Sequence, residues 1–322
     1  EDLRKQLSQD RAAADTPPVD DRLCTGIGRL NQLSDTIASS HNVSGDENDQ
    51  RLIWTQNLEH VPEGLARQRD AGLVYFVGCV GAFFPRSYRV PQALTRVLEE
   101  AEEEFTTLGG EEWCCGYPLL ALGEHDQAER MARHNVEQLG ALEARTLVTT
   151  CPSCYHMWKH IYPGLLGQEL DVKVVHASEL LASLIKAGRV PMGELSLRVT
   201  YHDPCDLGRK GGVYEAPRHV LRGIPGVTLV EMSGSGQISE CCGGGGNVES
   251  FDPDAVSEVA LHRVDRAVEV GADMIVSGCQ QCERTLMGAV RRHPEARKAR
   301  MRVVDITELV LRAIERRESQ GA

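Results

Sequence analysis

The chain has 322 residues, enough for about two ordinary domains, and 41% of them are hydrophobic, as in a packed globular protein. Its formal net charge of −12, without a basic cluster, excludes nucleic acid as a partner because phosphate repels such a surface. No apolar run approaches the roughly 20 residues of a membrane-spanning helix, and residues 1–10 lack the apolar run of a secretory signal. We therefore expect a cytoplasmic protein that reaches a membrane only through a partner.

Residues 1–70 differ from the rest of the chain. They contain Thr16-Pro17-Pro18 and a polar stretch from Ser44, with only modest periodicity. We expect an N-terminal arm, extended with a helix or two, that packs on a partner. Cys24 lies in this arm as an unpaired thiol, and we expect it to be a packing residue and not a ligand.

Residues 71–190 predict a first α/β domain. Apolar runs predict buried strands over 73–77, 105–108, 146–150 and from Lys173. Pro91 opens one helical pattern, and Ala128 begins another that Gly140 is placed to end as a C′ glycine. A last helix is expected after the strand that starts at Lys173.

Residues 191–322 repeat this order and predict a second domain. Strands are expected over 197–201, 227–230, 274–277 and from Arg302. Pro217 opens a short helix, and a longer helix starting near Val256 is expected to end at Gly271. The sequence therefore predicts two duplicated, pseudo-symmetric α/β domains with mainly parallel sheets, and ligands gather beyond the carboxyl ends of such strands.

Ten of the eleven cysteines fall into two sets with one order of spacing. The sets are Cys79, Cys114, Cys115, Cys151 and Cys154, and Cys205, Cys241, Cys242, Cys279 and Cys282. Their intervals differ by one position, so an internal duplication is the simplest explanation. A disulfide framework is disfavoured in a reducing cytosol, and a redox Cys-x-x-Cys of the thioredoxin type explains neither the adjacent pairs nor the repeat.

Five thiols in each set indicate iron–sulfur clusters rather than zinc. Structural zinc takes four ligands, so one thiolate would be left over, although zinc remains the leading alternative. The tight cysteine runs of ordinary cubane clusters are absent, which suggests a larger or irregular iron core. Gly116, Gly243 and Gly244 would let the backbone approach the cluster and donate N–H groups, although a flexible turn explains them as well.

The motifs around these cysteines resemble the cysteine-rich "CCG" domain, duplicated as in the B-type subunit of heterodisulfide reductase and the corresponding part of its D-type subunit. The resemblance covers residues from about 75 to 315. It rests on "VGC" ending at Cys79, "EEWCCGYP", "TTCPSCYHMW", "YHDPCDLGR", "ECCGGGGN" and "SGCQQC". It implies that each set of five cysteines holds one noncubane [4Fe-4S] cluster, and that the pair of clusters cleaves a disulfide.

The same resemblance implies partners. Fused family members carry a ferredoxin domain ahead of the first unit, whereas residues 1–70 have only Cys24, so a ferredoxin-like iron–sulfur subunit is expected as a separate chain. A flavoprotein subunit is expected too, with a membrane cytochrome as a further candidate.

Two residues near the second set are candidate catalytic groups. His202 and Asp203, in "YHDPC", could orient a thiolate or move the proton that disulfide cleavage requires. They could equally cap the turn after the strand. Trp113, beside Cys114, is expected to shield a cluster from water or simply to fill the core.

Two functions follow from these patterns. The first is an enzyme subunit, an oxidoreductase that reduces a disulfide or a similar substrate at the cluster pair. The second is an electron relay between a flavoprotein dehydrogenase and a quinone or membrane cytochrome, without bond chemistry of its own. The sequence names neither the substrate nor the direction of electron flow.

Overall fold

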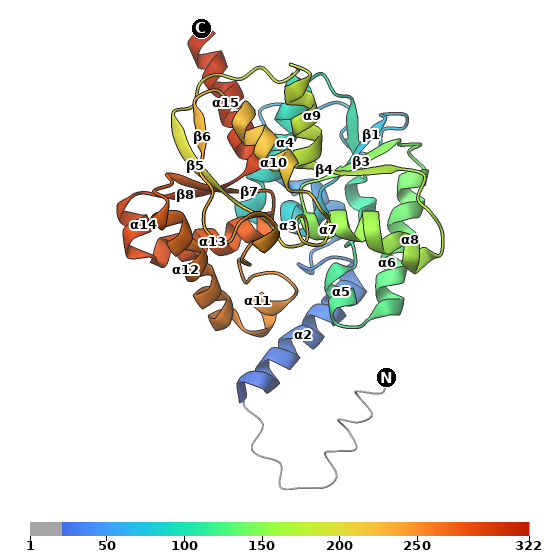
Figure 1. Cartoon of the computed structure of the whole chain (residues 1–322). Coiled ribbons are helices and arrows are strands. Elements are labelled where there is room, and N and C mark those ends of the chain that lie inside the picture. The colour runs from blue at the N-terminus through green and yellow to red at the C-terminus, as the bar shows by residue number, and fades with distance from the viewer. Residues whose placement is uncertain (1–20, 322) are drawn as a thin grey trace.

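The computed structural model describes residues 21–321, whose strands form two four-stranded sheets, one in each half of the chain (Figure 1). The first sheet contains β1 (Leu73–Phe76), β2 (Phe105–Thr107), β3 (Thr146–Thr149) and β4 (Lys173–His176). The second contains β5 (Leu197–His202), β6 (Val227–Leu229), β7 (Met274–Ser277) and β8 (Arg302–Asp305). All pairs are parallel, in the orders β2-β1-β3-β4 and β6-β5-β7-β8. The predicted duplicated α/β fold is confirmed.

Helices connect the strands in the same way in both halves. Those of the first half are α3 (Gly78–Phe83), α4 (Arg89–Glu100), α5 (Tyr117–Ala121), α6 (His125–Gly140), α7 (Pro152–His156), α8 (Tyr162–Leu166) and α9 (Ala177–Lys186). Those of the second half are α10 (Glu215–Gly223), α11 (Val248–Phe251), α12 (Pro253–Glu269), α13 (Gln280–Arg292), α14 (Pro294–Lys298) and α15 (Ile306–Gly321). A parallel pair of strands needs such a crossover, which explains the alternation.

One hydrophobic core joins the two halves. Helix α4 packs on α15 and α9 packs on α10, so the first long helix of each half meets the last helix of the other (Figure 1). Buried residues from both sheets and all four helices belong to this core, among them Tyr75, Leu94, Leu181, Tyr201, Val220 and Leu309. The exchange of equivalent helices is what a pseudo-two-fold repeat requires.

The described part of the arm packs on its own chain. Helix α2 (Asp21–Ser40) contacts α5 of the first half and α11 of the second, and lies along the lower edge of the molecule in Figure 1. A 3₁₀-helix, η1 (Asn48–Asn57), packs on α3 and buries Trp54 completely. Residues 21–57 therefore pack in part on their own chain, while α2 leaves Leu23 and Ile27 exposed, and the expectation that the arm packs on a partner stays a prediction.

Two local expectations are wrong. Cys24 is exposed and is not a packing residue, because α2 buries only Gly26, Ser34 and Ile37 and leaves its first turn in solvent. Gly140 is the last residue of α6 and does not end it in a left-handed conformation, which Glu143 adopts instead (φ 56°). Gly271 has the predicted left-handed conformation after α12 (φ 62°). No helix among residues 21–321 is both long and apolar enough to cross a membrane.

Candidate metal centres

The two cysteine sets lie where the strands end. In the first sheet Phe76 pairs with Thr149, so Cys79 and Cys151 follow two neighbouring strands at one edge. In the second sheet His202 pairs with Ser277, which brings Cys205 and Cys279 to the equivalent edge. These four cysteines therefore lie beyond the carboxyl ends of parallel strands, the edge at which such sheets hold ligands.

Within each set the thiols form one continuous series of sulfur contacts. In the first set the order of contacting side chains is Cys79, Cys114, Cys115, Cys154 and Cys151. In the second set it is Cys205, Cys241, Cys242, Cys282 and Cys279. The sulfur atoms of Cys242 and Cys282 are 3.3 Å apart, and all ten cysteines are free thiols. The same contact order therefore occurs twice, with five sulfur donors in each site.

This donor set fits a multinuclear iron–sulfur core better than a single small ion. A tetrahedral ion needs four mutually close ligands, whereas five thiols in series extend over a larger volume. The backbone approaches the first cysteine set closely at Gly78. This glycine is in a left-handed conformation, and a Cβ there would lie 3.2 Å from Cys154 Sγ. One group of three ligands within 4.8 Å of one another is found among residues 21–321, formed by His202, Cys242 and Cys282.

Neighbouring thiols within each site have different pKa values. Hydrogen bonds from Cys114 and Cys154 lower the pKa of Cys115 to about 6, while contact with Cys115 raises the pKa of Cys154. In the second site, hydrogen bonds from Cys205 and Cys242 lower the pKa of Cys241. One thiol in each set is therefore ready to be a thiolate ligand at neutral pH.

A buried ion pair from the N-terminal segment supports the first site. Arg51 Nη1 lies 2.7 Å from Glu112 Oε1, both side chains are 2% exposed, and Arg51 Nη2 donates to Cys79 Sγ at 3.5 Å. Glu112 also accepts hydrogen bonds from the backbone N–H groups of Val77 and Gly78, both at 2.8 Å. Burial raises the pKa of Glu112, and Arg51 opposes this shift. The pair places a fixed positive charge beside a candidate ligand.

His202 and Asp203 belong to different networks beside the second site. Arg263 Nε donates to His202 Nδ1 at 3.2 Å, and burial lowers the pKa of His202 to about 3. The ring is therefore neutral with its proton on Nε2, which has no hydrogen-bond partner among the described residues. Asp203 points away to Arg218, with contacts of 2.8 and 3.0 Å, and accepts from the Gly236 N–H.

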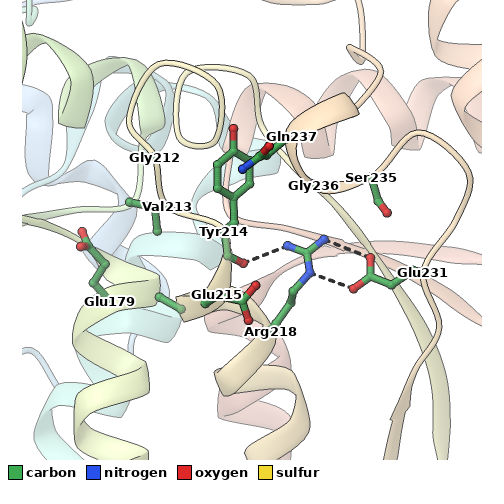
Figure 2. Close-up of a pocket in the computed structure, with 11 residues that line it drawn as sticks. Glu179, Gly212, Val213, Tyr214, Glu215, Arg218, Glu231, Ser235, Gly236 and Gln237 are labelled. Atoms are coloured by element: carbon green, nitrogen blue, oxygen red, sulfur yellow. Dashed lines mark hydrogen bonds and ion pairs between the residues drawn. The ribbon is translucent and has the colours of Figure 1, made fainter.

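Arg218 links Asp203 to a surface pocket of about 640 Å³ (Figure 2). Its guanidinium donates to the Tyr214 carbonyl and to both oxygens of Glu231. Figure 2 shows Glu231 at the pocket rim, with Glu179 on the opposite wall. Asp203 is thus part of a structural ion-pair chain that anchors the loop before Cys205.

The three candidate glycines are each held by close neighbours. Gly116 and Gly243 are left-handed, with φ of 81° and 88°. Their N–H groups donate to Cys114 Sγ at 3.5 Å and to Cys241 Sγ at 3.3 Å. A Cβ at Gly244 would lie only 2.1 Å from Thr285 Oγ1. These positions are therefore tightly packed and are not flexible turns.

The loop of the second half also reaches the first site. All five cysteines of the first set line a cavity of about 280 Å³ together with Gly244, Gly245 and Gly246. Apolar side chains of Leu33, Val43 and Phe84 complete much of its wall. The two cysteine sets are thus joined by one glycine-rich loop, a contact between distant segments that the spacing alone did not indicate.

Arg51, Glu112 and Arg263 were not predicted from the sequence. Arg51 lies 28 positions before Cys79, and Arg263 lies 61 positions after His202. No motif spacing marks them, because helices and loops far apart in the chain bring them to the sites. Glu112, two residues before Cys114, was the one candidate that its neighbourhood could have revealed.

Comparison with known proteins identifies the repeated unit. The model of the cysteine-rich CCG domain matches residues 73–159 and again residues 199–287. The D-type subunit of the dihydromethanophenazine:CoB–CoM heterodisulfide reductase of Methanosarcina mazei is 38% identical over 292 residues, covering 89% of this chain and 68% of that protein.

Two further relatives have different names. A probable membrane-anchored ferredoxin of Chromohalobacter salexigens is 35% identical over 98% of this chain and 44% of its own length. An EtfAB:quinone oxidoreductase of Syntrophomonas wolfei is 32% identical over 74% of this chain and 34% of its own length. The chain belongs to the cysteine-rich CCG-domain family, among the iron–sulfur oxidoreductase subunits that include the D-type subunit of heterodisulfide reductase.

Proposed function

We propose that this chain is the iron–sulfur subunit of a heterodisulfide-reductase-like complex. It would hold two noncubane [4Fe-4S] clusters, which together reduce a disulfide or a similar substrate. The observation that carries this proposal is the identical order of sulfur contacts in both sets of five thiols. Five donors per site exceed what one tetrahedral ion can use.

The chain's own residues would perform distinct tasks at each site. When bound, the clusters would supply single electrons and iron atoms that can take a substrate sulfur. The ten cysteines would hold the iron, and the Gly116 and Gly243 N–H groups would stabilise thiolate charge. Arg51 would offset negative charge at the first site, which favours the reduced state there.

His202 is the candidate group for orienting a thiolate of the second site through a hydrogen bond. Arg263 fixes the tautomer, so the Nε2–H is free to donate to a sulfur of the second site. Asp203 would act indirectly, by holding the loop that carries Cys205 through its contact with Arg218. The ring lies within 4.8 Å of two sulfur atoms of the second set, so its N–H would stabilise thiolate charge when a disulfide opens, and the proton itself would come from solvent.

Partners are proposed on the same basis. A ferredoxin-like iron–sulfur subunit and a flavoprotein subunit would deliver electrons, and a membrane cytochrome is a further candidate. The names of the relatives support this assembly, since they include a membrane-anchored ferredoxin and an EtfAB:quinone oxidoreductase. Such partners would bring a cytoplasmic chain to a membrane.

Metal analysis of the anaerobically reconstituted chain tests the cofactor. We expect about eight irons per chain, as two four-iron centres. Cys79→Ala and Cys205→Ala should each reduce iron to about half of the wild-type content, whereas Cys24→Ala should leave it unchanged because Cys24 is outside both sets. A colourless, zinc-containing protein would contradict the proposal.

A relay without bond chemistry is the second candidate function, favoured by the EtfAB:quinone oxidoreductase relative. The two functions differ in their response to sulfur compounds. The purified complex should consume a disulfide when given a low-potential donor, and thiols should change the electron paramagnetic resonance spectrum of its oxidised clusters. An unchanged spectrum with no turnover would favour the relay.

A further inference from the structure

Three aromatic rings are stacked at the surface beside the first site. The Trp113 indole lies between the imidazoles of His41 and His134, with ring centroids 3.5 and 3.6 Å away and interplanar angles of 4° and 10°. All three side chains are half-buried, whereas Trp54 and Trp158 are fully buried. A role in shielding a cluster from water would need only the Trp113 ring. It does not explain a stack of three rings that solvent reaches.

Hydrogen bonds connect the stack directly to the first cysteine set. The Cys114 N–H donates to the His41 carbonyl at 2.7 Å. Asn135 accepts from the Trp113 N–H at 2.9 Å and donates to the carbonyls of Trp113 and Cys114 at 3.2 and 3.1 Å. The stack is therefore fixed in orientation and is one peptide bond from a candidate iron ligand.

One arginine, Arg130, lies at the rim of the stack in a chain of net charge −12. The Arg130 guanidinium lies 5.6 Å from the centre of the Trp113 ring and 3.4 Å from His41 Nε2. Within residues 21–321 it contacts these rings and does not pair with a carboxylate. An unneutralised cation at an aromatic surface attracts an acidic protein partner.

The second half has no such surface at the equivalent position. Glu240 precedes Cys241 as Trp113 precedes Cys114, and it lies 3.7 Å from His262, the counterpart of His134. Arg263 and Arg266 also contact Glu240, at 3.6 and 3.7 Å. Arg266 also pairs with Glu269 at 3.1 Å, so two arginines face two carboxylates there, and the aromatic surface with an unpaired arginine belongs to the first half.

We propose that the His41–Trp113–His134 stack, with Arg130 at its rim, is the docking surface for an acidic one-electron iron–sulfur donor. The inference rests on the proposed iron–sulfur role of the first site. One electron leaves the reduced donor, which is oxidised, and enters the cluster held by the first cysteine set, which is reduced. No bond forms or breaks, and no proton is transferred.

A reduced plant-type [2Fe-2S] ferredoxin serves as the probe for the reconstituted full-length chain. Stopped-flow absorbance should give a second-order reduction rate that falls with added salt. Arg130→Glu should lower this rate at low salt by about tenfold and weaken calorimetric binding of oxidised ferredoxin to a similar degree. Arg291→Glu, an exposed charge reversal on α13, is the matched control and should match wild type.

Changes in the stack separate docking from electron transfer. Trp113→Leu should slow reduction at saturating ferredoxin, while Trp113→Phe, which keeps an aromatic ring between the two imidazoles, should slow it less. Reduction by dithionite, which needs no docking, should be equal in all variants. The proposal is overturned if Arg130→Glu behaves like Arg291→Glu, or if Trp113→Leu transfers electrons as fast as wild type.

The same measurements distinguish this failure from failure of the proposed function. A chain that gains no iron and no cluster absorbance contradicts the iron–sulfur role itself. A chain with full iron content and normal dithionite reduction, but with ferredoxin affinity and rate insensitive to Arg130→Glu, refutes the docking surface alone.

Discussion

The two metal centres have equivalent ligands but different surroundings. The first is enclosed by the N-terminal segment, which contributes Arg51 of the Arg51–Glu112 ion pair, and Cys79 and Cys114 are buried. The second is built within its own domain, and its counterparts Cys205 and Cys241 are half-buried. Duplication therefore copied the donor atoms and their order, whereas the charge and solvent access around them diverged.

The divergence extends to the helix that follows each cysteine pair. Asn135 of α6 holds the Trp113 and Cys114 backbone, whereas its counterpart Arg263 of α12 contacts His202 and Glu240. An amide thus supports the first site where a buried guanidinium supports the second. The guanidinium holds the neutral His202 ring beside sulfur atoms of the second site.

Removal of one carboxylate from each centre should give the largest contrast. Glu112→Gln leaves Arg51 buried without its counter-charge, which should cost about 3–5 kcal/mol of unfolding free energy. Glu240→Gln removes a carboxylate that is 35% exposed and 3.6–3.7 Å from its partners, one of which is the buried Arg263, so its cost should be smaller, about 1–2 kcal/mol. Urea unfolding of the metal-free proteins measures both, and equal costs would show that the ion pair does not distinguish the sites.

Equivalent residues at the ends of β4 and β8 should give opposite pH responses. His176 and Asp305 both cap the following helix, by accepting from Ser178 N and Thr307 N. Burial lowers the pKa of His176 to about 4 and raises that of Asp305 to about 7. Folding therefore favours proton binding by Asp305 and disfavours proton binding by His176.

The sign of each contribution follows from linkage. The Asp305 contribution is complete below the unfolded pKa of 3.8 and is lost as pH rises through about 7, whereas the His176 contribution is complete above 6.5 and is lost as pH falls through about 4. Between pH 5 and 8, Asp305→Asn should make stability rise with pH relative to wild type, by about 2–3 kcal/mol at most. His176→Gln should shift the dependence in the opposite direction. The unfolding free energy of both variants is measured with urea at each pH. If it changes with pH in the same way in both variants, the assignment is contradicted.

The Gly244–Thr285 contact tests how tightly the glycine loop is held on α13. Gly244→Ala would place a Cβ 2.1 Å from Thr285 Oγ1, and the resulting overpacking should cost about 1–3 kcal/mol. Gly245→Ala is a matched control, because a Cβ there has no atom within 4 Å. Thr285→Ala should restore most of the stability of Gly244→Ala. If both alanine variants unfold at the same urea concentration, the loop is less constrained than its contacts indicate.

Much of this protein could be predicted from local patterns. The strands, the duplication and the two sets of five cysteines follow from apolar runs and from spacings within single domains, because a strand determines where the next few residues lie. All eight observed strands begin at the predicted residue, and the six strands with a predicted end stop within one residue of it.

The surroundings of the sites depended on tertiary packing. Arg51 reaches Cys79 only because η1 packs on α3, and the Gly244–Gly246 loop reaches the first site only because the two halves share a core. The Trp113 stack likewise joins three separate segments of the chain. Hydrophobic periodicity and ligand spacing act over short ranges, so the sequence determined which thiols form the two sites. Packing between distant segments decided the charge, exposure and neighbours of those thiols.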